Sequence, residues 1–389
     1  MRRKRGGNSN QNRDENFLIV PSSSYRNLFC SLCLLDGIDV SFESLQAYAY
    51  CLTNSSLVFP NLEKKEKFFL KKSWNKIEFK VVRYFSHLCF MTVFTYSYEN
   101  EKEVNQQKRS VKFVKKIQKK GLVNNRSSLE NYLKDTEKIT SQLENSRRFN
   151  LERLIRLNFA YDSELGRPFY GDRSKLKDVK DIDFLIVQKF LKKKRLDYLD
   201  IFVGYPEASN LLTFKKVYKP ASKIFFHTNE LKVNPRVRKL SLNWKFDDCN
   251  VYNFQYSKIN SELSFLNKLA LFETVKVIFD LKEEDLILSY IDSFVSFATA
   301  VSEEEVFSKL NSEIEDKFSL GLAKLKDRLF KFDSIEEEAK FYLLLNGLNL
   351  SLDKSRYINL LGSLTLDNIK KETLNLTYLG SLNLKGDKK

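Results

Sequence analysis

Hydrophobic positions along the chain follow two different periods, one typical of strands and one typical of helices. Residues 78–98, EFKVVRYFSHLCFMTVFTYSY, are rich in β-branched and aromatic residues and predict one or two strands. Shorter apolar runs predict further strands over residues 182–187, 199–203, 223–227 and 250–256. These strands are separated by stretches whose apolar residues have the spacing of a helix.

The predicted helices carry recognisable start and stop signals. Ser41 is a favoured N-cap residue for a helix over residues 41–53. Residues 108–160 keep a helical pattern, with Gly121 as a predicted helix stop. From 258 to 345 the pattern is helical and acidic, and the segment SEEEVFSKLNSEIEDKF has a capped start.

Together these elements predict an α+β fold. A mixed helical and sheet central region precedes a mainly helical C-terminal region and a short terminal β-hairpin. The hairpin is predicted because LGSLTL at 361–366 recurs as LGSLNL at 379–384, within an alternating pattern. The predicted regions are a basic polar tail (1–16), an N-terminal α/β region (17–100), a basic central region (101–257), an acidic helical region (258–345) and a Leu-rich hairpin tail (346–389).

Charge is distributed unevenly along the chain. The 389 residues have a net charge of +16, yet residues 101–240 carry 33 basic and 17 acidic side chains, whereas residues 281–340 carry 8 and 15. A positive field concentrated in one region is expected of a protein whose partner is a polyanion, most often nucleic acid. Composition therefore favours a nucleic-acid partner over the other interpretation, a basic surface kept for solubility.

Several classes of protein are excluded by composition. Five cysteines in a long chain do not form a disulfide framework, which indicates a reducing compartment. The pair Cys30 and Cys33 forms a CxxC, but its apolar flanks favour buried thiols over a zinc site. We expect no membrane span, because no run of about 18 apolar residues is present.

Basic side chains gather in four places that we predict to contact RNA phosphates. The second of these places, residues 108–126, has the pattern of an amphipathic basic helix. The other interpretation of its lysines is that they form a helix face exposed to solvent, without a partner. The predicted contacts are Arg2, Arg3, Lys4 and Arg5; Lys108, Arg109, Lys112, Lys115, Lys116, Lys119, Lys120 and Arg126; Lys192, Lys193, Lys194 and Arg195; and Arg236, Arg238 and Lys239.

A different chemistry is indicated by residues 169–187, FYGDRSKLKDVKDIDFLIV. Asp181 and Asp183 stand one residue apart at the start of a predicted strand, an arrangement that suits a divalent metal. The other interpretation is that these carboxylates cap the strand and pair with neighbouring lysines.

The same segment resembles the core motif of polymerase-β-type nucleotidyltransferases. The resemblance implies a glycine turn at Tyr170-Gly171 and a third carboxylate at Asp200, with Mg²⁺ bound by Asp181, Asp183 and Asp200. The segment departs from the family in having Asp172 where a serine is usual, and in its short gap to Asp200.

We interpret the chain as an RNA-binding structural component of a large ribonucleoprotein. The abundance of Phe and Lys, which have A/T-rich codons, favours an organellar, mitochondrial ribosome. The expected partners are rRNA and neighbouring proteins of the assembly, and no catalytic residue, metal or cofactor is expected. Two alternatives stay open: a Mg²⁺-dependent nucleotidyltransferase, and a viral nucleoprotein that sheathes single-stranded RNA.

Overall fold

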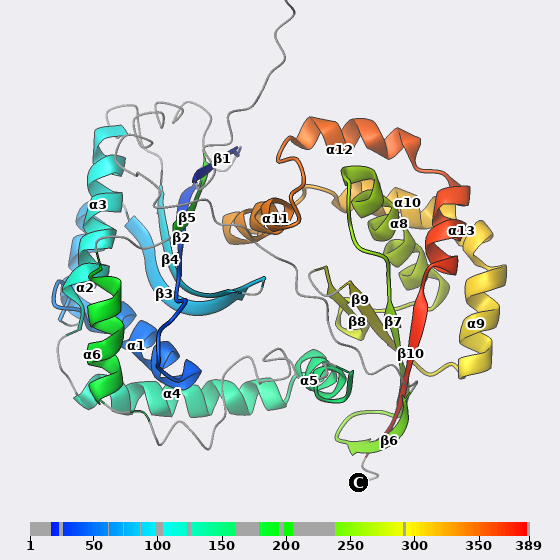
Figure 1. Cartoon of the computed structure of the whole chain (residues 1–389), viewed down its shortest axis with the longest axis horizontal. Coiled ribbons are helices and arrows are strands. Elements are labelled where there is room, and N and C mark those ends of the chain that lie inside the picture. The colour runs from blue at the N-terminus through cyan, green and yellow to red at the C-terminus, as the bar shows by residue number, and fades with distance from the viewer. Residues whose placement is uncertain are drawn as a thin grey trace, which may run out of the picture.

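The computed structural model describes most of the chain. The described residues are 17–22, 26–60, 62–72, 74–85, 87–97, 104–122, 126–159, 179, 181–193, 198–204, 238–290 and 293–386. They form an α+β fold with two five-stranded sheets, as predicted. The two sheets face each other across the centre of the molecule, with helices packed on their outer sides (Figure 1).

The first sheet has the strand order β1-β5-β2-β4-β3. Its strands β1 and β5 run parallel, and the other neighbours are antiparallel. The strands are β1 (Phe17–Pro21), β2 (Arg26–Leu34), β3 (Trp74–Tyr84), β4 (His87–Ser97) and β5 (Tyr198–Gly204). The helices of this lobe are α1 (Phe42–Asn54), α2 (Leu62–Lys72), α3 (Val104–Lys120), α4 (Arg126–Glu144) and α6 (Asp181–Leu191).

The second sheet has the order β6-β10-β7-β9-β8. Its strands are β6 (Arg238–Trp244), β7 (Cys249–Gln255), β8 (Leu286–Ser289), β9 (Phe294–Thr299) and β10 (Thr377–Gly386). Its helices are α8 (Glu262–Ile278), α9 (Glu303–Ser312), α10 (Ile314–Arg328), α11 (Ile335–Gly347), α12 (Lys354–Leu360) and α13 (Leu366–Leu374). Helix α5 (Arg147–Phe159) lies between the lobes, at the end of the long helix α4 (Figure 1).

Several local predictions are confirmed by the capping geometry. The Ser41 hydroxyl accepts a hydrogen bond from the Ser44 amide at 3.1 Å, and Ser302 caps α9 in the same way. Gly121 ends α3 with a φ of 83°, a left-handed conformation that glycine adopts without steric cost. Strands predicted over 78–98, 199–203 and 250–256 correspond to β3 and β4, to β5 and to β7.

Four local predictions need correction or fall outside the described residues. The segment 258–345, predicted to be helical, also contains strands β8 and β9 of the second sheet. Residues 182–187 belong to helix α6, because Val187, Phe190 and Leu191 are buried at helical spacing while Leu185 is exposed. The C-terminal segment has no hairpin: LGSLTL forms a turn and enters α13, and LGSLNL lies in the single strand β10. The strand predicted over 223–227 lies outside the described residues.

Helix α11 holds the two lobes together. In Figure 1 it lies between the two sheets. The Tyr84 hydroxyl, at the end of β3, donates to the Leu343 carbonyl of α11 at 2.6 Å. Gly347 faces Phe85 so closely that an added Cβ would come within 1.7 Å of the ring. One hydrophobic cluster accordingly runs from β2 and β5 of the first sheet into α8 and α11 of the second lobe.

Candidate functional site

The carboxylates proposed to bind metal have separate partners in the structure. Asp183 lies in the first turn of α6, where its carboxylate accepts a hydrogen bond from the Ser44 hydroxyl at 2.5 Å. Asp200 is buried in the middle of β5, where it accepts from the Ser31 hydroxyl and pairs with the Lys115 ammonium at 3.3 Å. The side chain of Asp181 is outside the described residues. Among the described residues, no three His, Cys, Asp or Glu side chains form a group suited to a metal ion.

The predicted phosphate contacts divide into three groups. On α3, the side chains of Lys112, Lys116, Lys119 and Lys120 are exposed, as are those of Lys192 and Lys193 at the end of α6. Two others are engaged in ion pairs: Lys115 with Asp200, and Lys239 with Glu303 at 2.8 Å. The remaining side chains lie outside the described part of the chain: Arg2, Arg3, Lys4, Arg5, Lys108, Arg109, Arg126, Lys194, Arg195, Arg236 and Arg238.

The five cysteines are all free thiols, and all five are buried. Burial, together with the nearby Asp200 carboxylate, raises the pKa of Cys30 to about 12. A thiol with a raised pKa is a poor metal ligand and a poor nucleophile, because both roles need the thiolate. The CxxC pair therefore fills the core of the first sheet, as its apolar flanks predict.

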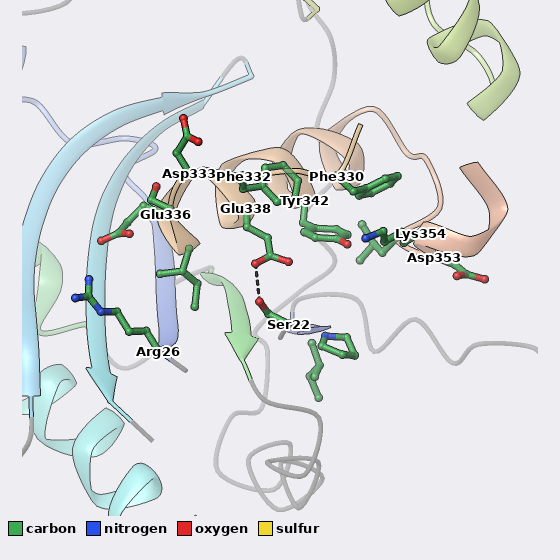
Figure 2. A pocket seen from close by; sticks show the side chains of 15 residues that line it. Ser22, Arg26, Phe330, Phe332, Asp333, Glu336, Glu338, Tyr342, Asp353 and Lys354 are labelled. Atoms are coloured by element: carbon green, nitrogen blue, oxygen red, sulfur yellow. Dashed lines mark hydrogen bonds between the residues drawn. The ribbon is translucent and has the colours of Figure 1, made fainter. Parts of the chain in front are cut away.

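A pocket of about 730 Å³ lies at the junction of the two lobes. One wall comes from the first sheet, through Ile19 and Pro21 of β1, Ser22 and the first residue of β2, Arg26. The opposite wall comes from the turn between α10 and α11, from α11 itself and from the start of α12 (Figure 2). Small-ligand sites typically have volumes of roughly 300 to 1,000 Å³, and the volume of this pocket falls within that range.

The wall from the second lobe is held rigidly by helix capping. The Ser334 hydroxyl accepts from the Glu337 amide at 3.2 Å, and the Glu337 carboxylate accepts from the Asp333 amide at 3.2 Å. These reciprocal bonds satisfy amides that the helix itself leaves unpaired. The start of α11 therefore presents Glu336 and Glu338 to the pocket from a fixed backbone.

Aromatic rings form the apolar part of that wall. Phe330 packs against Phe341 and Tyr357, with ring centroids 5.3 Å and 5.5 Å apart. Its backbone has a φ of 61°, a left-handed conformation that is unfavourable for a residue with a side chain. Packing against four neighbouring rings holds Phe330 in this conformation, and Phe332 and Tyr342 extend the aromatic surface into the pocket.

The best-positioned polar group is Glu338. Its carboxylate accepts a hydrogen bond from the Ser22 hydroxyl at 2.7 Å and so joins α11 to the segment after β1 (Figure 2). Partial burial raises the pKa of Glu338, although the Ser22 hydrogen bond and the Lys354 charge both lower it. The charges of Glu338 and Asp353 also act on Tyr342, whose pKa burial raises to about 12.

The residues of this pocket carry no motif that would predict it from the sequence. Ser22 and Glu338 are far apart in the sequence, and each is an ordinary polar residue in its own segment. The available signals were the Ser334–Glu337 capping pattern and the density of aromatic residues between 330 and 342. Both signals identify a helix start, but neither indicates what faces it.

Comparison with known proteins gives similarity in structure and none in sequence. No protein-family model matches the chain, and no curated protein sequence matches it. A conserved protein from Enterococcus faecalis V583 has a similar structure, with a TM-score of 0.72, 12% identity and 96% of each chain covered. The inactive domain of a peptidase M16 from Pseudomonas fluorescens gives a TM-score of 0.63 at 10% identity, with 95% of each chain covered.

A third similar structure is a longer chain. The periplasmic protease PqqL from Escherichia coli gives a TM-score of 0.64 at 10% identity, covering 95% of this chain and 46% of PqqL. At such identities the similarity establishes the fold. The chain therefore has the fold of these proteins, and it matches a little under half of the length of PqqL.

These similarities correct the functional prediction. The fold matched over nearly the whole chain is that of peptidase-like proteins, so the interpretation as an RNA-binding ribosomal protein is wrong. The same fold also counts against the two alternative interpretations, a nucleotidyltransferase and a viral nucleoprotein. An rRNA partner and an organellar location lose their support. No helix of the described residues has the length and apolarity needed to cross a membrane.

Proposed function

We propose that this chain is a non-catalytic M16-like unit that binds polypeptide without cleaving it. The observation that carries the proposal is the match, over 95% of both chains, to a structure described as an inactive domain of peptidase M16. The protease PqqL contains one such unit in about half of its length. We infer that this chain is likewise one such unit and that it binds polypeptide.

The donor set of the sequence does not fit a zinc peptidase. The HExxH and HxxEH motifs of zinc peptidases each need two histidines within five residues. The chain has two histidines in total, His87 and His227, and they are far apart in the sequence. The segment HTNEL, 227–231, has Leu231 where the second histidine of HxxEH would stand. His87 instead lies at the start of β4, with its Nδ1 atom 3.4 Å from Asp36.

The lysine-rich face of α3 fits a polypeptide partner as well as it fits nucleic acid. Its exposed lysines attract acidic side chains by the same long-range electrostatics that attract phosphates. The proposal therefore accounts for the uneven charge of the chain without RNA.

A binding and cleavage assay tests the proposal. A fluorescein-labelled, unstructured acidic polypeptide is titrated with the chain, and its anisotropy is followed with and without added Zn²⁺. We expect saturable binding, weakened by salt, with the polypeptide intact on a gel after hours. Cleavage that EDTA abolishes would contradict the non-catalytic assignment, and an unchanged anisotropy would contradict polypeptide binding.

A further inference from the structure

We propose that the pocket between the lobes binds an organic cation, an alkyl guanidinium or ammonium group inserted between Glu338 and the aromatic wall (Figure 2). The preference for a cation stands on the pocket itself. A polypeptide side chain as the source of that cation rests on the proposed function.

The sign of the charge decides between a cation and an anion. Four carboxylates line the pocket, those of Asp333, Glu336, Glu338 and Asp353, against two cationic side chains, Arg26 and Lys354. The N-terminus of α11 adds the equivalent of roughly half a positive charge. The balance stays negative, so a cation is attracted and an anion is repelled.

The carboxylates differ in how far they are already engaged. Asp353 caps α12, because its carboxylate accepts from the Ser355 amide at 2.9 Å and from the Ser355 hydroxyl at 2.7 Å. Glu338 receives the single Ser22 hydroxyl at one of its two oxygens. Among the described residues, no hydrogen bond or ion pair engages the half-buried carboxylate of Glu336. Glu338 is thus the carboxylate that a cation beside the rings would meet, whereas Glu336 points toward Arg26 and adds negative charge to the pocket (Figure 2).

The aromatic wall selects an organic cation over a metal ion. Phe330, Phe332 and Tyr342 line the pocket with aromatic rings, whose faces attract cations and whose carbon surface can bury the apolar part of an alkyl chain. The pocket already shows this contact: the Lys354 ammonium lies 5.6 Å from the centroid of the Phe330 ring. A hard metal ion would need several converging oxygen ligands, and the described residues contain no such group.

Lys354 therefore occupies the position of a competing internal cation. It is the first residue of α12 and is exposed. A ligand in the pocket would compete with it for the Phe330 ring and for the negative charge of Glu338. Removing its charge should strengthen binding of an external cation, and removing the carboxylates should weaken it. These opposite directions make the proposal specific.

The test is isothermal titration calorimetry with three probes: agmatine, the peptide acetyl-Ala-Arg-Ala-amide, and the same peptide with norleucine in place of arginine. We expect agmatine and the arginine peptide to bind and the norleucine peptide to bind at least tenfold more weakly. In the double variant Glu336→Gln/Glu338→Gln, we expect both cations to bind at least tenfold more weakly. In Lys354→Ala, we expect them to bind several-fold more tightly.

A matched control is Glu304→Gln. Glu304 is an exposed glutamate in the first turn of α9, a helix that does not line the pocket. Its variant should bind within twofold of the unaltered chain. The single variant Glu338→Gln removes only the carboxylate beside the rings and keeps a carbonyl oxygen for the Ser22 hydroxyl, so it replaces the double variant if the latter does not fold.

Three outcomes would overturn the proposal: no binding of either cation, equal binding of the norleucine and arginine peptides, or unchanged binding in the glutamine variants. If the arginine peptide binds and agmatine does not, the cation is assigned to a polypeptide side chain. Glutamate-dependent binding of agmatine, in a chain that binds no unstructured polypeptide, would support the pocket and contradict the proposed function.

Discussion

At the scale of single residues, the main constraints on the fold come from buried charged side chains. Lys115 and Asp200 come from α3 and β5 and meet in the interior, with 17% and 3% of their side chains exposed. Burial lowers the pKa of Lys115, and the Asp200 carboxylate opposes that effect. The lysine also lies 4.3 Å from the centroid of the Tyr198 ring. This pair fixes α3 on the sheet, so Asp200 is engaged structurally.

Replacing Lys115 with methionine should destabilise the fold. The Asp200 carboxylate would stay buried without its cation, which typically costs about 3 to 5 kcal/mol. Urea unfolding measures the change, with Lys112→Met on the exposed face of α3 as the control. The double variant Lys115→Met/Asp200→Leu should recover much of the loss. A Lys115→Met chain as stable as the Lys112→Met chain would contradict the structural role.

Glu338 should make stability depend on pH in the opposite sense from most carboxylates. Its pKa is raised in the folded chain, so folding favours its protonated form, and stability falls as pH rises through that pKa. The groups that face it are Ser22, Lys354 and Tyr342, with Arg26, Glu336 and Asp353 also lining the pocket.

The variant Glu338→Gln should accordingly be more stable than the unaltered chain at pH 7. The gain is at most about 1 kcal/mol, because water screens a half-exposed group. It should shrink towards zero near pH 4, where the carboxyl is protonated in the folded and unfolded states alike. Thermal unfolding across this range measures it, and a gain that grows as pH falls would show that the sign is wrong.

At the scale of elements, sequence patterns predicted caps and strands well and failed where tertiary packing decides. Ser41, Gly121 and Ser302 end or start helices through local bonds, so their roles could be predicted from the sequence. The run from Phe184 to Val187 suits a strand or a helix equally by composition. Its packing against α1 and α3 makes it helical, and a single sequence does not show that packing.

Helix α11 is the element that joins the lobes, and Gly347 is its most sensitive position. A side chain there would overlap the ring of Phe85, which is itself buried. Gly347→Val should therefore cost about 1 to 3 kcal/mol through overpacking, whereas Gly362→Val, with nothing within 4 Å of its added Cβ, should cost less. Equal stabilities of the two variants by urea unfolding would contradict this close approach of the lobes.

At the scale of the whole molecule, the candidate site joins segments that the sequence keeps far apart. The pocket needs β1, Ser22 and Arg26 from the first sheet, and the turn after α10, helix α11 and the start of α12 from the second lobe. The charge distribution along the sequence indicates a region with a strong positive field. Such a field does not show whether the partner is RNA or another polyanion. The error in function arose there, because acidic polypeptides and RNA impose the same electrostatic requirement.

The fold itself was predictable as a class and not as a topology. Each sheet joins strands from distant segments: β1 pairs with β5 in one, and β6 with β10 in the other. Apolar periodicity predicts where such strands occur and which of their faces is buried. It does not predict which strands pair with each other. The long-range pairings, and with them the opposed sheets and the pocket, therefore had to come from the structure.

The central claim is the proposal that this chain binds polypeptide and leaves it intact. Native mass spectrometry of the chain mixed with one unstructured polypeptide, in the presence of Zn²⁺, tests binding and cleavage in a single spectrum. The account predicts a complex whose mass is the sum of the two full-length chains and that persists after prolonged incubation. Fragments of the polypeptide, or two species that never associate at micromolar concentration, would contradict it.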